Sequence, residues 1–383
     1  MKFDKDVYYV GVNDYNIDLF EGQFPVENGM AYNSYVILDE KVAIFDTVDA
    51  NFIVQWLSNV KNVLNGKQPD YLIIQHVEPD HSSGIKLIIE NYPSIKLVVN
   101  SKSLVMIENY YGKLPCDKII VSDGDTLNLG KHNLKFVFAP MIHWPEVMMT
   151  YEKNSKILFS ADAFGKFGTL DTDEDWACEA RRYYFGIVGK FGMLVQNLFK
   201  KLSNLDINAI CPLHGPVLEE NLSYYLNLYQ IWSSYGIEAK GTAIFYTSVY
   251  GNTKKAVDKL NEILTKNGEK TAVFDLIRCD MTEALEDAFK YGKIILATTT
   301  YNGDIFPPMH EFITHLTARN YQNRTIGFIE NGSWAPTAKK VMQSMLENCK
   351  NVKFFENHVS ILSGVKEENI EQIKALSNEI LSI

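Results

Sequence analysis

The decisive stretch of this sequence is Gln75-His76-Val77-Glu78-Pro79-Asp80-His81-Ser82-Ser83-Gly84. The preceding apolar run, Tyr71 to Ile74, predicts a buried strand, and the following amphipathic run, Ile85 to Tyr92, predicts a helix. Two imidazoles and two carboxylates therefore lie together at a strand-to-helix turn. Neighbouring side chains leave an extended strand in different directions, so one metal ion cannot easily bind all four, whereas two adjacent ions can. A polar loop with a helix cap would explain one Asp or Ser, but not two His besides.

Three more ligand-type residues follow strands that are predicted elsewhere in the chain. His143, Asp162 and His214 each come directly after an apolar run. A single His after a strand is more often a structural residue than a metal ligand. Three such strand ends, beside the turn at 75–84, would be a strange coincidence in a sequence with only eight His. We therefore expect these residues to join the turn in one metal centre.

Composition limits the class of protein. With 383 residues the chain is long enough for two domains, and 46% hydrophobic and 22% charged residues are ordinary for a soluble globular protein. The net charge of −10 argues against nucleic-acid binding and against docking on an acidic membrane. Five scattered cysteines without a CxxC pair fit a reducing cytoplasm better than a disulfide framework or an iron–sulfur site.

Targeting signals are not evident in the sequence. Residues 1–6 lack the apolar core of a signal peptide. No segment approaches the roughly 18 apolar residues that are needed to span a bilayer. We therefore expect a cytoplasmic protein that binds no membrane.

The first part of the chain mixes short β segments with helices. Runs at 34–38 and 42–46 predict a hairpin, and residues 51–64 have helical spacing up to the turn pair Asn65-Gly66. Further strands are predicted at 95–99, 118–121, 134–139, 147–151 and 157–160. Residues 174–236 are predicted to be mostly helical, around a strand-like run at 209–212. This mixture predicts a layered α/β or α+β domain.

The pattern changes near residue 240, where strands and helices begin to alternate regularly. The five predicted strands are 243–246, 272–276, 293–297, 325–329 and 352–355. The five predicted helices are 252–266, 281–290, 308–319, 335–347 and 366–382. This alternation predicts a doubly wound parallel sheet, whose ligands bind at the carboxyl ends of the strands. We therefore expect two domains, at 1–240 and 241–383.

Three loops at strand ends of the second domain indicate a cofactor site. The first, Thr247-Ser248-Val249-Tyr250-Gly251-Asn252-Thr253, opens a helix, so its hydroxyls and free backbone N–H groups suit a terminal phosphate. It matches neither G-x-x-x-x-G-K-[ST] nor G-x-G-x-x-G, and by itself it is also compatible with an ordinary helix cap. The other two loops are Thr298-Thr299-Thr300-Tyr301-Asn302-Gly303-Asp304 and Glu330-Asn331-Gly332-Ser333-Trp334-Ala335-Pro336.

The metal-ligand pattern resembles that of the metallo-β-lactamase fold, an αββα sandwich. Residues 76–81 read H-x-E-x-D-H, and the zinc hydrolases of that fold have His where this chain has Glu78. With a carboxylate there, the sequence is similar to the flavodiiron proteins, also called A-type flavoproteins. Hard carboxylate oxygens suit iron or manganese, whereas imidazole-rich sites suit zinc among other metals. The resemblance implies a diiron centre in which His76, Glu78 and His143 bind one iron, Asp80, His81 and His214 bind the other, and Asp162 bridges them.

The three loops of the second domain resemble the phosphate loop and the two ring-flanking loops of flavodoxin, which implies FMN. In this resemblance the phosphate loop contributes Thr247, Ser248, Val249, Tyr250, Gly251, Asn252 and Thr253. The flavin ring is bordered by Thr300, Tyr301, Asn302, Gly303, Asn331, Gly332 and Ser333. Trp334 would cover or flank the ring by aromatic stacking.

Together the two resemblances cover the whole chain and imply a flavodiiron reductase. The family reduces dioxygen to water, nitric oxide to nitrous oxide, or both, with FMN relaying electrons to the iron. The metal and the flavin lie on separate domains, and the family brings them together in a head-to-tail homodimer, or a dimer of dimers. The chain ends at Ile383, just after its last predicted helix, so we expect an external electron donor. Rubredoxin is the usual donor, and some methanogen relatives use a reduced deazaflavin.

Two other functions fit parts of the sequence. One is a zinc hydrolase of the lactamase fold with a flavodoxin-like electron-transfer appendage. The other is a non-enzymatic FMN electron carrier with a vestigial metal domain, against which the complete ligand set argues.

Several residues outside the ligand set also bear on the metal centre. Asp46 ends a predicted strand and could orient a ligand His. Tyr32 and the pair Tyr183-Tyr184 are candidates to line the pocket, and Tyr32 and Tyr184 are our candidate catalytic residues, although amphipathic packing explains them equally well. We expect the remaining His residues to be structural or exposed: His132 on an exposed turn, and His310, His315 and His358 without clustered carboxylates.

Overall fold

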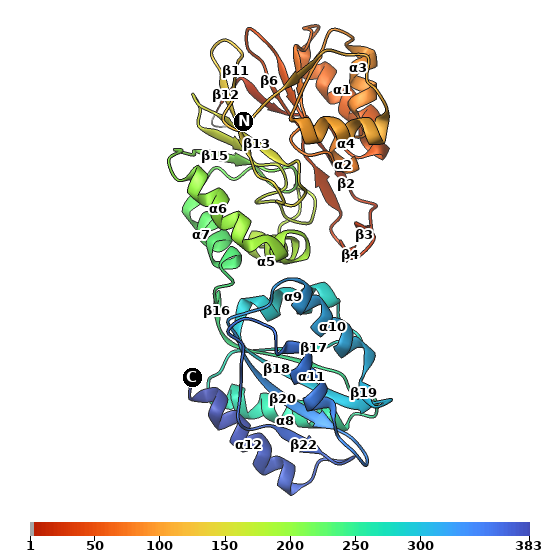
Figure 1. Ribbon diagram of the computed structural model, residues 1–383, viewed down its shortest axis with the longest axis vertical. Coiled ribbons are helices and arrows are strands. Elements are labelled where there is room, and N and C mark those ends of the chain that lie inside the picture. Colours follow the sequence, from red (N-terminus) through yellow and green to blue (C-terminus); the bar gives the residue numbers. More distant parts are fainter. Residues whose placement is uncertain (1–3) are drawn as a thin grey trace. The chain divides into compact units, whose positions relative to one another are not determined.

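The computed structural model describes residues 4–383 and is drawn in Figure 1. Contacts between residues divide the chain into two compact units, and the division falls between Gln230 and Ile231. Each unit has its own sheets and its own hydrophobic core. None of the helices within residues 4–383 has both the length and the apolar character that crossing a bilayer requires.

Two sheets form the centre of the first unit, with the orders β1-β6-β7-β8-β9-β10 and β11-β12-β13-β14-β15. The strands of the first sheet are, in that order, Val7–Tyr9, Tyr35–Ile37, Ala43–Phe45, Tyr71–Ile73, Lys96–Val99 and Lys118–Ile120. Those of the second are Thr126–Asn128, Asn133–Phe138, Met148–Glu152, Ile157–Phe159 and Ala209–Cys211. The predicted hairpin is confirmed, because β6 pairs antiparallel with β7.

Alternation along the strands builds two cores. In β7, Ala43 and Phe45 point into the space between the sheets, where Phe45 stacks on Phe159 of β14 with ring centroids 4.2 Å apart. Ile44 points the opposite way, into a core shared with three helices. These are α1 (Ile53–Leu64), α3 (Ile85–Asn91) and α4 (Ser101–Tyr111). The period of two in the strand thus gives the layer order helix, sheet, sheet.

The remaining elements of this unit lie near the ends of the sheets. The helices are α2 (Pro79–Ser82), α5 (Trp176–Tyr183), α6 (Gly192–Leu202) and α7 (Leu222–Ser233), with shorter turns at Ala50–Phe52, Tyr184–Val188 and Gly189–Phe191. Helix α6 packs on the loops that follow β12 and β14, around a small apolar cavity. The sequence did not predict four short strands, which pair as β2 (Val12–Asp14) with β5 (Met30–Tyr32) and β3 (Leu19–Phe20) with β4 (Phe24–Pro25).

The second unit is built on a parallel sheet of order β17-β16-β18-β20-β21, with β22 also paired to β20. The strands β16, β17, β18, β20, β21 and β22 are Ala239–Tyr246, Thr271–Asp275, Tyr291–Tyr301, Thr325–Asn331, Lys353–Phe354 and Val359–Ile361, and β19 (Asp304–Ile305) pairs antiparallel with β18. The helices α8 to α12 are Asn252–Lys266, Met281–Lys290, Pro307–Ala318, Ala338–Leu346 and Glu367–Leu381.

In chain order the strands of this sheet lie 2-1-3-4-5, one of the two common doubly wound orders. The predicted alternation of strand and helix is confirmed. The fifth strand differs from the expectation, because it is split into β21 and β22. The loops after β16, β18 and β20 all begin at the carboxyl edge of the sheet (Figure 1).

Candidate metal centre and cofactor pocket

The metal-type residues come from four strand ends of the first unit. His76 and Glu78 lie in the loop after β8, and Asp80 and His81 lie in α2, directly behind that loop. Pro79 takes the first position of α2, where its missing N–H is no loss, so the chain can turn sharply into the helix. The other three residues follow β12, β14 and β15: they are His143, Asp162 and His214.

One cluster contains His76, Glu78, His143 and one oxygen of Asp162. His143 Nε2 lies 3.0 Å from Glu78 Oε2 and 3.1 Å from Asp162 Oδ2. His76 Nε2 lies 3.1 Å from Glu78 Oε2, 3.4 Å from Asp162 Oδ2 and 3.3 Å from His143 Nε2. Donor atoms about 2.1 Å from one metal ion lie roughly 3 to 3.5 Å from one another, so four side chains here surround one point.

A second cluster contains Asp80, His81 and His214. His81 Nε2 and His214 Nε2 lie 3.0 Å apart, and each lies 3.4 Å from Asp80 Oδ2. Asp162 Oδ1 lies 3.2 Å from His81 Nε2 and 3.8 Å from His214 Nε2. Asp162 therefore presents Oδ2 to the first cluster and Oδ1 to the second, which is the geometry of a bridging carboxylate.

The donor set fits two cations. In each cluster two imidazole nitrogens face each other at 3.0 to 3.3 Å, where a shared cation removes the repulsion between their lone pairs. Both oxygens of Asp80 and Oδ1 of Asp162 are buried and accept no hydrogen bond within the described residues, a costly arrangement without a compensating charge. Four imidazoles and three carboxylates suit iron or manganese at least as well as zinc.

The electrostatics of the first cluster favour positive charge. Burial disfavours the protonated ring of His143, but the Asp162 and Glu78 carboxylates outweigh burial and raise its pKa to about 9. Burial likewise opposes ionisation of Asp162, yet His76 and His81 hold its pKa well below the usual range. The same carboxylates that attract a proton here would stabilise a metal ion.

The far nitrogens of two ligand rings are held by oxygen atoms. His76 Nδ1 lies 2.8 Å from Glu146 Oε1, and His214 Nδ1 lies 2.8 Å from the carbonyl oxygen of Ala31. Each acceptor takes the Nδ1–H, so that Nε2 keeps its lone pair for a metal. Asp46 acts on the backbone instead, because its Oδ1 accepts the N–H groups of Gln75 at 2.7 Å and His76 at 3.2 Å. Burial raises the pKa of Asp46 to about 6, against these hydrogen bonds.

Aromatic residues enclose the centre. The rings of Tyr32, Tyr183 and Phe20 lie 5.9, 5.6 and 5.4 Å from the ring of His214. The Tyr183 hydroxyl is buried and has no hydrogen-bond partner within the described residues. Tyr184 faces elsewhere, with its ring 5.1 Å from the rings of both Phe185 and Tyr229. Of the predicted tyrosines, Tyr32 and Tyr183 are therefore brought to the metal clusters.

Two acidic residues near the centre were missed by sequence reasoning. Glu146 lies three positions after His143, and nothing in the pattern distinguishes it from a surface carboxylate. Glu21, in the turn between β3 and β4, is solvent-exposed at its surface, yet partial desolvation and the Glu78 carboxylate raise its pKa. A two-residue strand pair gives no periodic signal that could have located it.

The expectation of an exposed His132 is wrong. Its side chain is fully buried, with Nδ1 3.3 Å from Glu152 Oε1 and Nε2 3.7 Å from Asp6 Oδ2. The other three non-ligand His join none of the His and carboxylate clusters found within residues 4–383: they are His310, His315 and His358.

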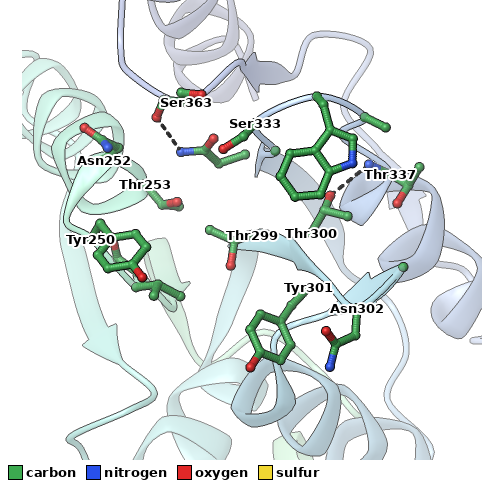
Figure 2. A pocket seen from close by; sticks show the side chains of 17 residues that line it. Tyr250, Asn252, Thr253, Thr299, Thr300, Tyr301, Asn302, Ser333, Thr337 and Ser363 are labelled. Carbon is green, nitrogen blue, oxygen red and sulfur yellow. Dashed lines mark hydrogen bonds between the residues drawn. The ribbon is translucent and has the colours of Figure 1, made fainter.

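The second unit has a pocket of about 740 Å³ at the carboxyl edge of its sheet (Figure 2). Thirteen of the residues predicted for cofactor binding line it: Ser248, Val249, Tyr250, Asn252, Thr253, Thr300, Tyr301, Asn302, Gly303, Asn331, Gly332, Ser333 and Trp334. Thr247 does not, because its hydroxyl lies 2.6 Å from that of Thr298 inside the core, and Gly251 does not line the wall. Thr299, Ala335, Thr337 and Ser363 also line the pocket.

This pocket offers groups suited to both the phosphate and the ring of FMN. The hydroxyls of Thr253 and Thr299 are buried without a hydrogen-bond partner within the described residues and border the same open space (Figure 2). Thr253 lies in the first turn of α8, where a helix N-terminus favours a phosphate. The rings of Tyr250 and Trp334 are 91% and 89% exposed, so large aromatic faces are left open for a planar ring.

Family profiles match both units. The profile described as ODP family beta lactamase matches residues 30–215, a segment that holds every residue of the two metal clusters. The profile described as Flavodoxin domain matches residues 243–363, which hold every residue that lines the pocket.

Relatives and solved structures with both units are similar to this chain. An uncharacterized protein of Methanocaldococcus jannaschii is 27% identical over 390 aligned residues, covering 100% of this chain and 98% of that protein. The anaerobic nitric oxide reductase flavorubredoxin of Escherichia coli is 27% identical, covering 90% of this chain and 74% of that protein. Two solved structures share the fold at 24% identity. They are the rubredoxin oxygen:oxidoreductase of Desulfovibrio gigas, with a TM-score of 0.91 and coverage of 100% and 98%, and the flavodiiron protein of Giardia intestinalis, with 0.90 and coverage of 98% and 95%.

Proposed function

This chain belongs to the flavodiiron protein family, and we propose that it is an oxidoreductase that uses FMN and a diiron centre to reduce dioxygen to water, nitric oxide to nitrous oxide, or both. Residues 1–240 would hold the iron and residues 241–383 the flavin. The observation that carries the proposal is Asp162, whose two oxygens face two separate ligand clusters. The pocket of the second unit, which would hold FMN, adds a source of electrons, which a hydrolase does not need.

The ligand set would hold the two metals as the sequence predicts. His76, Glu78 and His143 would bind one iron, Asp80, His81 and His214 the other, and Asp162 both. When bound, the two irons would supply Lewis-acid polarisation of a small diatomic substrate, and FMN would supply its electrons. Glu78 supplies a hard oxygen donor and a negative charge that partly balances the two cations.

The surrounding side chains orient the ligands and exclude water. The Trp144 ring packs 5.2 Å from the ring of His76 and 6.0 Å from that of His143, and Phe20 covers His214. These apolar side chains would favour a small diatomic molecule over a bulky acyl substrate. Protons consumed in the reaction would come through hydroxyls near the centre, for which Tyr32 and Tyr183 are the candidates, whereas Tyr184, which the sequence also suggested, would have to act from the side of Tyr229.

In the second unit FMN would be held without a basic residue. Ser248, Asn252 and Thr253 would bind the phosphate with the N-terminus of α8, and the two later loops would border the ring. Trp334 would stack on the ring, because its own ring is open to the pocket.

The electron donor we propose is a rubredoxin, with a reduced deazaflavin as the second candidate. Support comes from the names of two similar proteins, a flavorubredoxin and a rubredoxin oxygen:oxidoreductase. We also propose a head-to-tail homodimer, or a dimer of dimers, located in the cytoplasm.

The function is tested with the full-length protein purified without oxygen. We expect two irons and one FMN per chain, and flavin reoxidation when the reduced protein is mixed in a stopped-flow instrument with dioxygen or nitric oxide. The ratio of the two second-order rate constants gives the substrate preference. Reoxidation by neither gas would refute the proposal. Zinc in place of iron, together with thioester or lactam hydrolysis, would favour a lactamase-fold hydrolase instead.

A further inference from the structure

The two metal clusters differ in the hydrogen-bond partners of their imidazole Nδ1 atoms, the ring nitrogens that face away from the metal position. In the first cluster, the buried carboxylate of Glu146 lies 2.8 Å from His76 Nδ1. In the second cluster, His214 Nδ1 has only the neutral carbonyl of Ala31, at 2.8 Å, and His81 Nδ1 has no hydrogen-bond partner within the described residues. One cluster therefore has a carboxylate hydrogen-bonded to a ligand ring, and the other has none at hydrogen-bonding distance: the buried Asp46 carboxylate interacts with His81 only through space.

Glu146 is held through one carboxylate oxygen and through its main chain. Its Oε1 accepts the backbone N–H of Val77 at 3.0 Å, in addition to the His76 ring, and its own carbonyl oxygen accepts from Asn100 Nδ2 at 2.6 Å. The side chain is 1% exposed, and Oε2 has no partner within the described residues. Burial and the two hydrogen bonds on Oε1 hold this carboxylate against the His76 ring.

From this asymmetry we infer that Glu146 is a positioning residue which makes the two irons inequivalent. The iron bound by His76, Glu78 and His143 is held more tightly, and its ferric state is favoured, relative to the iron bound by Asp80, His81 and His214. The inference rests on the proposed function only in that both clusters bind iron.

The physical cause is the charge carried through the ring. A carboxylate that accepts the Nδ1–H makes the imidazole a stronger donor at Nε2 and fixes its orientation, and losing such a partner typically costs 10- to 100-fold in metal affinity. The added negative charge favours Fe(III) over Fe(II) in a low-dielectric site. A backbone carbonyl fixes orientation equally well but carries no net charge.

The difference in affinity between the two irons is tested by measuring metal release, an experiment that does not depend on catalytic turnover. Ferrous protein is mixed anaerobically with an excess of a ferrous-iron chelator, and the absorbance of the complex is followed. We expect two phases of equal size with rates about tenfold or more apart. Asp80→Asn, which weakens only the second cluster, should remove the fast phase or speed it further while the slow phase remains.

Glu146→Gln then separates the effect of the negative charge from that of the hydrogen bond, because the amide oxygen still accepts the Nδ1–H of His76. We expect the slow phase to accelerate about 10- to 100-fold and the fast phase to stay unchanged, whereas a general loosening of the fold would accelerate both. Glu146→Asp, which keeps the charge, should recover part of the difference. In a redox titration the lower of the two iron potentials should rise in Glu146→Gln and the higher should not move.

Glu152→Gln is the matched control. Glu152 is another fully buried Glu beside a His ring, 3.3 Å from His132 Nδ1, but it joins neither metal cluster. It should leave both release phases and both potentials unchanged. A single release phase in the wild type, or equal acceleration of both phases by Glu146→Gln, would overturn the inference. Absence of bound iron would instead overturn the proposed function.

Discussion

Glu78 is the residue on which the choice of metal depends. Its Oε2 lies 3.1 Å from His76 Nε2 and 3.0 Å from His143 Nε2, so it completes the first cluster with an oxygen rather than a nitrogen. The two imidazoles hold its pKa well below the usual range despite burial, so it is ionised at neutral pH. A hard anionic donor at this point suits iron and disfavours a zinc-type ligand set.

Replacing Glu78 by His should therefore remove the oxidoreductase activity but not the flavin. We expect iron content to fall, turnover of dioxygen and nitric oxide to drop at least about 100-fold, and FMN content to stay unchanged because the flavin pocket lies in the other unit. Elemental analysis, flavin absorbance and gas-electrode assays measure the three quantities. Glu90→His, an exposed change on α3, is the control. Full turnover in Glu78→His would refute the ligand assignment.

Tyr183 and Tyr184 make a second residue-scale comparison. Burial raises the pKa of Tyr183 well above its usual value, and Asp162, Asp80 and Glu78 add to the shift, so the phenol keeps its proton beside the metal clusters. Because the hydroxyl has no partner within residues 4–383, Tyr183→Phe should not destabilise the fold. It should lower kcat/KM for the diatomic substrate about 10- to 100-fold if the hydroxyl supplies a proton. If kcat/KM falls in Tyr184→Phe but not in Tyr183→Phe, the sequence-based expectation that Tyr184 is catalytic would be favoured instead.

Sequence reasoning located the residues that end predicted strands and missed those whose role depends on tertiary contact. His143, Asp162 and His214 each follow an apolar run, and the fold brings them to one point. Glu146 has no such signal, because its role comes from the ring of His76, 70 positions away in the sequence. The expectation that His132 is exposed was wrong for a related reason. Its polar turn sequence gives no sign that Glu152, from another strand, packs against its ring.

At the scale of elements, His132 and Glu152 join the start of the chain to the β12–β13 hairpin. His132 immediately precedes β12, and Glu152 is the last residue of β13. Carboxylate oxygens of Asp4 and Asp6 lie 3.9 and 3.7 Å from His132 Nε2. Burial opposes a charged ring, but Glu152, with Asp4 and Asp39, outweighs it and raises the pKa of His132. The pKa of Glu152 is correspondingly lowered by the His132 ring, against burial.

This pair predicts a pH-dependent contribution to stability. Since the folded pKa of His132 is raised, its contribution is complete below the unfolded value of about 6.5 and is lost as pH rises through the folded pKa. His132→Gln should therefore cost about 2 kcal/mol at mildly acidic pH and less at alkaline pH. Unfolding midpoints of variant and wild type, measured from pH 6 upward with the metal retained, check this. A difference that grows with pH would contradict it.

Helices and strands long enough to show a repeating hydrophobic pattern were predicted from the sequence, and very short ones were not. Helices α8 and α9 match the expected ranges, because their apolar spacing runs over several turns. Strands β2 to β5 have two or three residues each, too few to show alternation. The same limit hid β22, and with it Ser363, which lies just beyond the strand and lines the flavin pocket.

At the scale of the whole molecule, the proposed reaction needs electrons to pass from a flavin in one unit to a metal centre in the other. The ligand clusters lie within residues 76–214 and the pocket within residues 248–363, so neither unit would hold both cofactors. If the protein is a head-to-tail dimer, the productive pair consists of the flavin of one chain and the irons of its partner.

A mixed dimer distinguishes this route from transfer within one chain. One chain carries Asp162→Asn, which disables the metal centre, and the other carries Asn252→Asp, which sets a negative charge at the phosphate end of the flavin pocket. Aspartate is well tolerated at a helix N-terminus, so α8 should fold normally without FMN. The two chains are co-expressed with different tags and the heterodimer is purified through both.

Each homodimer should be inactive, and the heterodimer should have about half of wild-type turnover, because one of its two symmetry-related routes keeps both an intact flavin and intact metals. Transfer within one chain predicts no activity in the heterodimer, since every chain then lacks one cofactor. Wild-type chains that carry the same two tags show whether purification itself preserves activity. Failure to isolate a doubly tagged species from fully active wild-type protein would mean that the monomer is the working unit, and the head-to-tail arrangement would be wrong.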